Sequence, residues 1–185
     1  MSPDVHQDDV ERVMHQLPYG LYIIGSREAG PPAGSGQSQV NGMMADWVMQ
    51  VSFQPRLLAV ALENDSHTLG NVRAHRFFTV NLLSQDKDGM ELARGFAQPY
   101  SGAKIEGREP QEAQKTHYKL EGVDYRTTER ACPVLAAALA WAECEAEQFL
   151  AIGDHTLVIG RVLDGRVERE GEPLTSTYTG WTYSG

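Results

Sequence analysis

The segment NGMMADWVMQVSFQP, residues 41–55, reads as a buried strand that ends at Pro55, but it carries residues that a plain core strand does not need. Asp46 lies between Ala45 and Trp47, a few residues after a Gly-Met-Met turn. A core strand gains nothing from a carboxylate at its mouth, because a buried charge is costly unless it is paired. The carboxylate beside the indole ring therefore predicts that something polar and flat binds there.

Strand and turn patterns on both sides of this segment predict a mainly β protein. Short runs rich in Val, Ile, Tyr and Phe and bounded by Gly, Pro or Asn are typical of strands. The predicted strands are residues 20–26, 43–53, 57–63 and 77–84, and then an antiparallel pair formed from Trp141 onward and from 155–167. The predicted helices are residues 3–16, about 68–76 and 89–97, and the polar connections are 27–39 and 98–124. Six or seven strands with two or three short helices favour a mainly antiparallel barrel.

The run VLAAALAWAECEAEQFLA, residues 134–151, supports two readings. Its alanines and glutamates favour a helix by propensity. From Trp141 onward, however, glutamates alternate with the small residues Ala142, Cys144 and Ala146. Alternation with a period of two is typical of a strand, so we predict an antiparallel pair with AIGD as its turn.

Composition argues against several classes of function. A chain of 185 residues suits one domain with a substantial core. The net charge of −9 argues against a nucleic-acid partner, which would need a basic face. The longest uncharged apolar run, residues 134–142, is too short to cross a membrane, and residues 1–13 have no apolar signal core. Two cysteines are too few for a disulfide framework, so we expect reduced thiols and a cytoplasmic protein.

Common catalytic and metal-binding motifs are missing from the sequence. GSGQSQ, residues 34–39, lacks the third glycine of a dinucleotide fingerprint and lies in a predicted loop. There is no phosphate-binding P-loop and no serine elbow of the hydrolase type. The six histidines show no pair at metal-ligand spacing, so we predict no metal site.

The segment ENDSHTLGN, residues 63–71, predicts a helix start that could hold a phosphate. Asp65 or Ser66 can cap this helix, whose first N–H groups have no partner within the helix. Hydroxyls at Ser66 and Thr68 beside those groups are typical of an anion site. Taken alone, such a segment more often only begins a helix. A turn histidine such as His155 is likewise usually a solvated surface residue.

Resemblance to a known family decides between these readings. The matching pieces are LYIIGSR, NGMMADWVMQVSFQPRLLAVALE, NDSHT, FFTVNLLS, LARGFA, CPVLAAALAWAECE, GDHTLVIGRV and YTGWTYSG, which follow in family order over residues 17–185. Together they resemble the flavin reductase-like family and are most similar to flavoredoxins and to the flavin reductase-like modules of flavo-diiron proteins. The resemblance implies an FMN-binding split β-barrel of Greek-key, antiparallel type. It also implies a single domain over residues 1–185, with residues 1–16 as an N-terminal helix.

The resemblance further implies which residues hold the flavin and its reductant. The implied cofactor-binding residues are Asn41, Gly42, Met43, Met44, Ala45, Asp46 and Trp47 along the ring and ribityl chain, Asn64, Ser66, His67 and Thr68 at the phosphate, and Asn81 and Arg94 in the cleft. His155 is implied as the catalytic group that faces the nicotinamide, and Phe96 as a residue beside the substrate.

Met44 and Asp46 depart from the family pattern, which often has Thr-Ala-Ser where this chain has Met44-Ala45-Asp46. Asp46 could accept a hydrogen bond from a ribityl hydroxyl or from flavin N3–H, but its charge would repel an anionic reduced flavin. We expect Met43 and Met44 to pack on the ring, with Asp46 and Trp47 at the edge of its pocket.

The activity that the resemblance implies is hydride transfer from NAD(P)H to FMN, with FAD as the alternative flavin. Reduced flavin or electrons would then pass to a partner monooxygenase or redox protein. A flavoredoxin-type electron carrier without a nicotinamide site remains an alternative, as does a barrel that has lost its flavin. A homodimer is also implied, because a second subunit would complete the open cleft. Trp181, with Tyr178 and Tyr183, predicts an aromatic tail that docks on the barrel or on the partner subunit.

Overall fold

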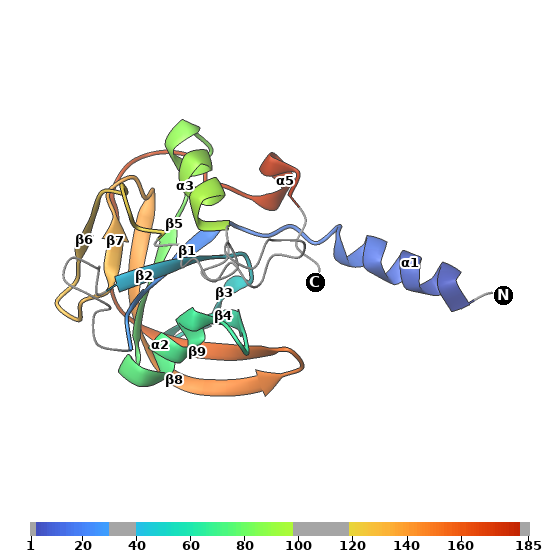
Figure 1. Cartoon of the computed structure of the whole chain (residues 1–185), viewed down its shortest axis with the longest axis horizontal. Helices are drawn as coiled ribbons and strands as arrows, with labels where there is room; N and C mark the ends of the chain where they lie inside the picture. Colours follow the sequence, from blue (N-terminus) through green and yellow to red (C-terminus); the bar gives the residue numbers. More distant parts are fainter. Residues whose placement is uncertain (1–2, 30–39, 98–118, 182–185) are drawn as a thin grey trace, which may run out of the picture.

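The computed structural model describes residues 3–29, 40–97 and 119–181, with only the backbone for residues 3–8. In these residues a seven-stranded sheet curls into a barrel, and a two-stranded sheet and short helices lie around it (Figure 1). The strands are β1 (Tyr22–Arg27), β2 (Val40–Ala45), β3 (Val48–Phe53), β4 (Arg56–Glu63), β5 (Phe77–Leu82), β6 (Tyr125–Thr127), β7 (Pro133–Leu135), β8 (Ala140–Ile152) and β9 (His155–Val167). The helices are α1 (Pro3–Met14), α2 (His67–His75), α3 (Lys87–Ala97) and α5 (Ser176–Thr179). The prediction of a mainly β, antiparallel barrel with short helices is confirmed.

The order of strands in the large sheet is β2-β1-β5-β8-β9-β4-β3, with every neighbouring pair antiparallel. β2 and β3 therefore lie at opposite edges of the sheet, although they follow each other in the chain. Asp46 and Trp47 connect the two edges. The Val48 N–H donates to the Asp46 carbonyl at 3.0 Å, and the Ala61 N–H of β4 donates to the Trp47 carbonyl at 3.1 Å. The prediction of one continuous strand over residues 43–53 is wrong, because side-chain alternation does not reveal a change of partner strand.

Two hydrophobic clusters hold the barrel and its helices together. Ile24 of β1 packs in the cluster that fills the barrel, together with Val60 and Phe78. Ile23 points to the opposite face of β1, as the alternation along a strand requires, and joins the second cluster with Phe96 of α3. Full burial of such a side chain contributes about 1.5–3 kcal/mol. β1 is therefore held on both faces, and α3 is fixed against the sheet.

The disputed run over residues 134–151 is a strand from Ala140 onward, and the predicted pairing with β9 is confirmed. Cys144 and Ala146 are fully buried in the barrel cluster. Helix propensities differ by less than about 1 kcal/mol per ordinary residue, so this burial outweighs them. The alternation is interrupted by a bulge after Glu143, which is buried and accepts a hydrogen bond of 2.7 Å from Arg130.

The short elements β6, β7 and α5 were not predicted from the sequence. β6 and β7 have three residues each and α5 has four, which is too short to establish a period. β6, β7 and the division of residues 43–53 into β2 and β3 bring the number of strands within the described residues to nine, against the six or seven predicted.

The two ends of the described chain behave differently. α1 extends away from the barrel (Figure 1), with Val10 and Val13 each 63% exposed. Trp181, by contrast, packs against the cluster beside α3, so this part of the predicted aromatic tail docks on the barrel. Tyr178 is exposed, and Tyr183 lies outside the described residues, as do most of the predicted connections over 27–39 and 98–124. Among the described residues, no helix has the length and apolar character needed to span a membrane.

Candidate flavin-binding site

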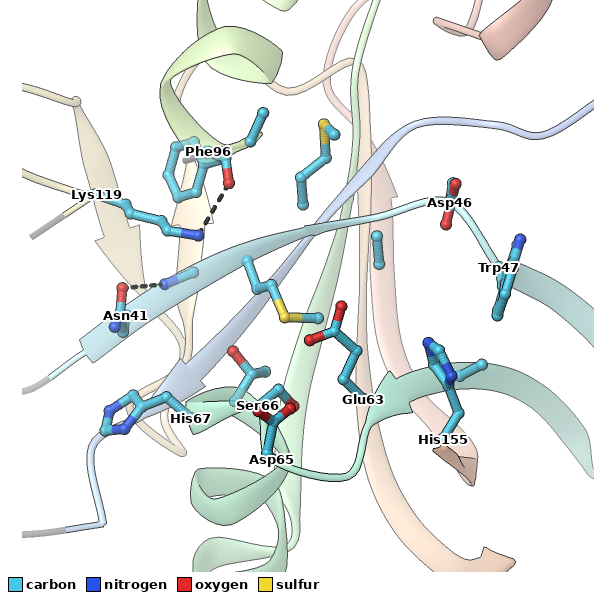
Figure 2. Close-up of a pocket in the computed structure, with 17 residues that line it drawn as sticks. Asn41, Asp46, Trp47, Glu63, Asp65, Ser66, His67, Phe96, Lys119 and His155 are labelled. Carbon is cyan, nitrogen blue, oxygen red and sulfur yellow. Dashed lines mark hydrogen bonds between the residues drawn. The ribbon is translucent and has the colours of Figure 1, made fainter. Parts of the chain in front are cut away.

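A cavity of about 560 Å³ opens where β2, its link to β3, the end of β4 and the start of α2 meet (Figure 2). Its size falls within the usual range for small-molecule sites, about 300–1,000 Å³. The lining residues are Asn41, Gly42, Met43, Met44, Ala45, Asp46, Trp47, Ala61, Glu63, Asp65, Ser66, His67, Thr68, Phe96, Ala97, Lys119 and His155. The structure thus brings together β2 and the segment 65–68, which are widely separated in the sequence.

One wall of the cavity is the edge strand β2. Within the described sheet β2 pairs only with β1, so its other edge turns its backbone toward the cavity. Gly42 keeps this wall close to α3, because a Cβ atom at that position would lie 2.5 Å from the ring of Phe96. Backbone N–H and C=O groups along a strand edge can hydrogen-bond the rim of a flat ligand.

The start of α2 forms one end of the cavity. The Ser66 hydroxyl accepts a hydrogen bond from the Leu69 N–H at 3.2 Å, so Ser66 is the N-cap of the two predicted candidates. Thr68 is buried in the first turn, and His67 contacts Glu28 at 2.5 Å. A helix start that opens onto a cavity offers N–H groups and the positive end of the helix dipole to an anion.

His155 and Trp47 lie side by side at the other end of the cavity (Figure 2), with ring centroids 4.9 Å apart. His155 Nδ1 lies 2.6 Å from a carboxylate oxygen of Asp154. This contact engages Nδ1, and within the described residues Nε2 has no hydrogen-bond partner, although the side chain is only 11% exposed. The hydrogen bond with His155 also lowers the pKa of the Asp154 carboxyl, since it favours the charged form.

Carboxylates outnumber cations along the cavity lining. Burial raises the pKa of Asp46, and this effect exceeds the opposing effects of the Asp46 and Trp47 N–H groups and of the charge on His155. Glu63 and Asp65 add two further carboxyl groups. The buried ammonium of Lys119 donates to the Phe96 carbonyl at 2.9 Å, away from the end where Asp46 lies (Figure 2). The helix start and Lys119 are therefore the parts of the lining that favour an anionic ligand group, while the Asp65 carboxyl beside the helix start opposes it (Figure 2).

Three residues of the predicted site lie outside the cavity lining, and Asn64 is one of them. Its N–H donates to the Asp154 carbonyl at 2.9 Å, and its side-chain amide donates to the Gly153 carbonyl at 3.1 Å. Its amide oxygen accepts a hydrogen bond of 2.7 Å from the Thr156 hydroxyl. Asn64 thus holds the turn that carries His155.

Asn81 and Arg94 are the other two predicted site residues that lie outside the cavity lining. Asn81 is fully buried; its amide donates to the carbonyls of Ile23 and Pro133, and its oxygen accepts from the Leu135 N–H at 2.9 Å. It therefore ties the small sheet to the barrel. Arg94 is exposed on α3 and does not line the cavity.

Sequence reasoning missed several lining residues. Ala61, Glu63, Ala97 and Lys119 were not predicted to line the site, and Asp65 was considered only as a helix cap. Glu63 is the register partner of His155 across β4 and β9, so strand pairing would have been needed to find it. Lys119 follows a polar stretch that gives no local sign of its burial.

The chain resembles known proteins over nearly its whole length. Residues 14–182 match the family described as flavin reductase like domain. The high molecular weight rubredoxin of Moorella thermoacetica is 30% identical over 90% of this chain and 64% of its own length. The ferric-chelate reductase (NAD(P)H) of Archaeoglobus fulgidus is 28% identical over 90% of this chain and 86% of its own. This chain thus spans less than two thirds of the first of these relatives.

The fold has relatives among solved structures. The NADH:FAD oxidoreductase of Streptomyces globisporus C-1027, solved with NAD and FAD fragments, superposes with a TM-score of 0.71. The match covers 95% of this chain and 90% of that one at 21% identity, which shows that the two share a fold. Because the family match extends over residues 14–182, the chain belongs to the flavin reductase-like domain family.

Proposed function

We propose that this protein binds FMN, or FAD as the alternative, in the cavity beside β2 and reduces it with NAD(P)H. The observation that carries the proposal is the order of groups along the cavity: a helix start at one end, a strand edge along the wall, and the His155–Trp47 pair at the other end. Membership of the flavin reductase-like family supports the same reading.

The residues present fit a flavin. The edge of β2 supplies backbone donors and acceptors for the rim of the ring, and Met43 and Met44 supply an apolar, polarisable surface. The start of α2, with Ser66 and Thr68, suits the phosphate because its N–H groups and dipole favour an anion. A bound flavin would supply hydride-accepting chemistry that no side chain here provides.

His155 is the proposed group for the nicotinamide. Because Asp154 engages Nδ1, the Nε2 atom is left to hydrogen-bond a carboxamide that enters the cavity beside Trp47. The bond to Asp154 also fixes the orientation of the ring. His155 therefore positions the reductant, and Asn64 supports it by holding the turn on which it lies.

Anaerobic mixing with NADH or NADPH tests this function. The flavin absorbance should bleach, and His155→Ala should slow the bleaching while the affinity for FMN changes little. A protein that binds FMN but is not reduced by either nucleotide would be an electron carrier instead. A purified protein that binds no flavin would refute the proposal altogether.

A homodimer is a further part of the proposal. Met49, Ala59 and Ile159 are register partners on β3, β4 and β9, so they share one face of the sheet. Ala61, which lines the cavity, is on that same face of β4, and Met49 is 60% exposed. Ala59 itself is buried, so Met49 is the exposed apolar side chain of this face, and exposed apolar surface next to a cavity is typical of an interface. Light scattering should give about twice the chain mass of 20.4 kDa, and a monomer that binds FMN tightly would contradict the dimer.

The proposed setting is the cytoplasm, where a monooxygenase or redox protein would take the reduced flavin or its electrons. Cys132 and Cys144 are both free and buried, which suits a reducing compartment. Adding candidate oxygenases to the reduced protein and measuring the rate at which the flavin is reoxidised would identify the acceptor.

A further inference from the structure

Asp46 differs from the other carboxyl groups of the cavity in its position. It lies on the link that closes the barrel, at the end of the cavity where His155 and Trp47 lie (Figure 2). Its backbone carbonyl accepts the Val48 N–H at 3.0 Å, which fixes the link. The Asp46 side chain lines the cavity, so its carboxyl group lies beside the space in which the proposed function places the reacting end of the flavin.

His155 and Asp154 connect this end of the cavity to solvent. Asp154 is 91% exposed, whereas the His155 side chain, 2.6 Å away through Nδ1, is 11% exposed. His155 also lines the cavity, and its charge lowers the pKa of Asp46, so the imidazole lies between an exposed acid and the Asp46 end of the cavity. A histidine in this arrangement can take up a proton at one ring nitrogen and release one from the other.

We propose that Asp46 takes up a proton from solvent when a bound flavin is reduced, and that Asp154 and His155 convey this proton. The inference rests on flavin binding, the first part of the proposed function. Hydride carries two electrons and one proton, so its addition leaves one extra negative charge in the cavity. NAD(P)H becomes NAD(P)⁺, the hydride goes to the flavin, and one solvent proton goes to the Asp46 carboxylate. The cavity then gains no net charge.

Electrostatics gives the reason for this uptake. Partial burial already raises the pKa of Asp46, so the carboxylate binds a proton more readily than a fully exposed aspartate does. New negative charge nearby favours the protonated form further, and by linkage protonation makes reduction easier. The repulsion expected from a carboxylate at this position is thereby removed at each reduction.

The other titratable groups of the cavity are placed less well for this role. Glu63 on β4 is the register partner of His155 and is therefore the nearest competitor. Asp65 and His67 lie at the start of α2, and Lys119 lies beside Phe96, away from Asp46 (Figure 2). Asp46→Asn is thus the diagnostic variant, and Glu63→Gln is its matched control, a carboxyl group of the same cavity changed in the same way.

The midpoint potential of bound FMN between pH 4 and 8 tests the proposal, with dithionite and mediators in place of NAD(P)H. The wild-type protein should show a pH interval in which one more proton is taken up per two electrons than in Asp46→Asn. This difference corresponds to a slope steeper by about 30 mV per pH unit for a two-electron couple. Glu63→Gln should keep the interval. Equal slopes in the wild type and Asp46→Asn, or loss of the interval in Glu63→Gln alone, would overturn the assignment.

A second measurement does not depend on the variant folding. The side-chain carboxyl signal of Asp46 can be followed by carbon NMR in the wild-type protein with FMN oxidised and then reduced. Its titration midpoint should move to higher pH on reduction, and an unchanged midpoint would overturn the proposal. A protein that binds no FMN would refute the proposed function itself, whereas one that binds FMN without this shift would refute only the proton uptake.

The path is tested by following proton uptake with an indicator dye after rapid reduction. His155→Phe should slow uptake by at least tenfold. It should also move the Asp46 midpoint to higher pH, because the charge of His155 lowers the pKa of Asp46 in the wild type. Unchanged uptake kinetics would show that the proton does not travel through His155.

Discussion

Replacing Ser66 and Thr68 by alanine tests whether the start of α2 binds the FMN phosphate. Both residues line the cavity, and the Ser66 hydroxyl caps the helix by accepting the Leu69 N–H at 3.2 Å. The hydroxyl can still donate its own proton to a phosphate oxygen. The double variant Ser66→Ala/Thr68→Ala therefore removes two donors from the proposed anion site and leaves the backbone N–H groups in place.

The size of the effect follows from these two donors. Hydrogen bonds to a charged group contribute about 1.5–3 kcal/mol each, and about 1.4 kcal/mol corresponds to a tenfold change in affinity. Water and the remaining N–H groups offset part of the loss, so we expect FMN binding to weaken at least about tenfold. Riboflavin has no phosphate, and its affinity should barely change.

Titration of the flavin-free variant with FMN and with riboflavin, followed by flavin fluorescence, measures both affinities. Losing the cap of α2 also costs about 0.5–2 kcal/mol of stability. Thr175→Ala is the matched control, because Thr175 caps α5 by accepting the Tyr178 N–H at 3.3 Å and does not line the cavity. It should lower stability without changing FMN affinity. Equal losses of FMN and riboflavin affinity in the double variant would refute the phosphate assignment.

Three further predictions concern parts of the fold outside the flavin site. Asn81→Leu should lower the free energy of unfolding, measured by urea titration, by about 1–3 kcal/mol, because it leaves the Leu135 N–H unpaired. An unchanged urea midpoint would contradict the role of Asn81 in holding the small sheet against the barrel. Cys132 and Cys144, whose pKa burial raises to about 12, should not react with a thiol reagent at pH 8 until the protein is unfolded, and rapid labelling of the native protein would contradict this. The pKa of Asp86 is lowered, first by the Gly89 N–H, so its contribution to stability is present above its unfolded pKa near 3.8 and is lost as pH falls through the lower folded value. The melting temperature of Asp86→Asn should therefore fall less than that of the wild type as the pH is lowered below about 4. If the melting temperatures of the two proteins fell in parallel with pH, this linkage would be refuted.

Local patterns in the sequence were enough to predict the class of fold. Short runs rich in β-branched residues predicted most strands, and the alternation from Trp141 onward correctly favoured a strand over a helix. A helix cap at Asp65 or Ser66 was predicted because its signal lies within four residues, and the structure shows that Ser66 is the cap. These features depend on the spacing of apolar side chains and on capping residues next to a helix, and both can be read from neighbouring residues in the sequence.

Pairing between distant strands was decided only by the tertiary structure. Residues 43–53 read as one strand, yet Asp46 and Trp47 divide it between the two edges of the sheet. The same pairing places Glu63 opposite His155. Lys119 lies in a polar connection, and only its burial in the folded chain brings it to the cavity.

Asn81 was predicted to line the flavin site, but tertiary contacts give it a structural role. It resembles a residue of the flavin cleft, but its amide ties the small sheet to the barrel. The physical reason is general: period and capping report which face of an element is buried, whereas register and closure depend on contacts between residues far apart in the chain. Those contacts determine which polar groups meet in a cavity and which are used to hold the fold together.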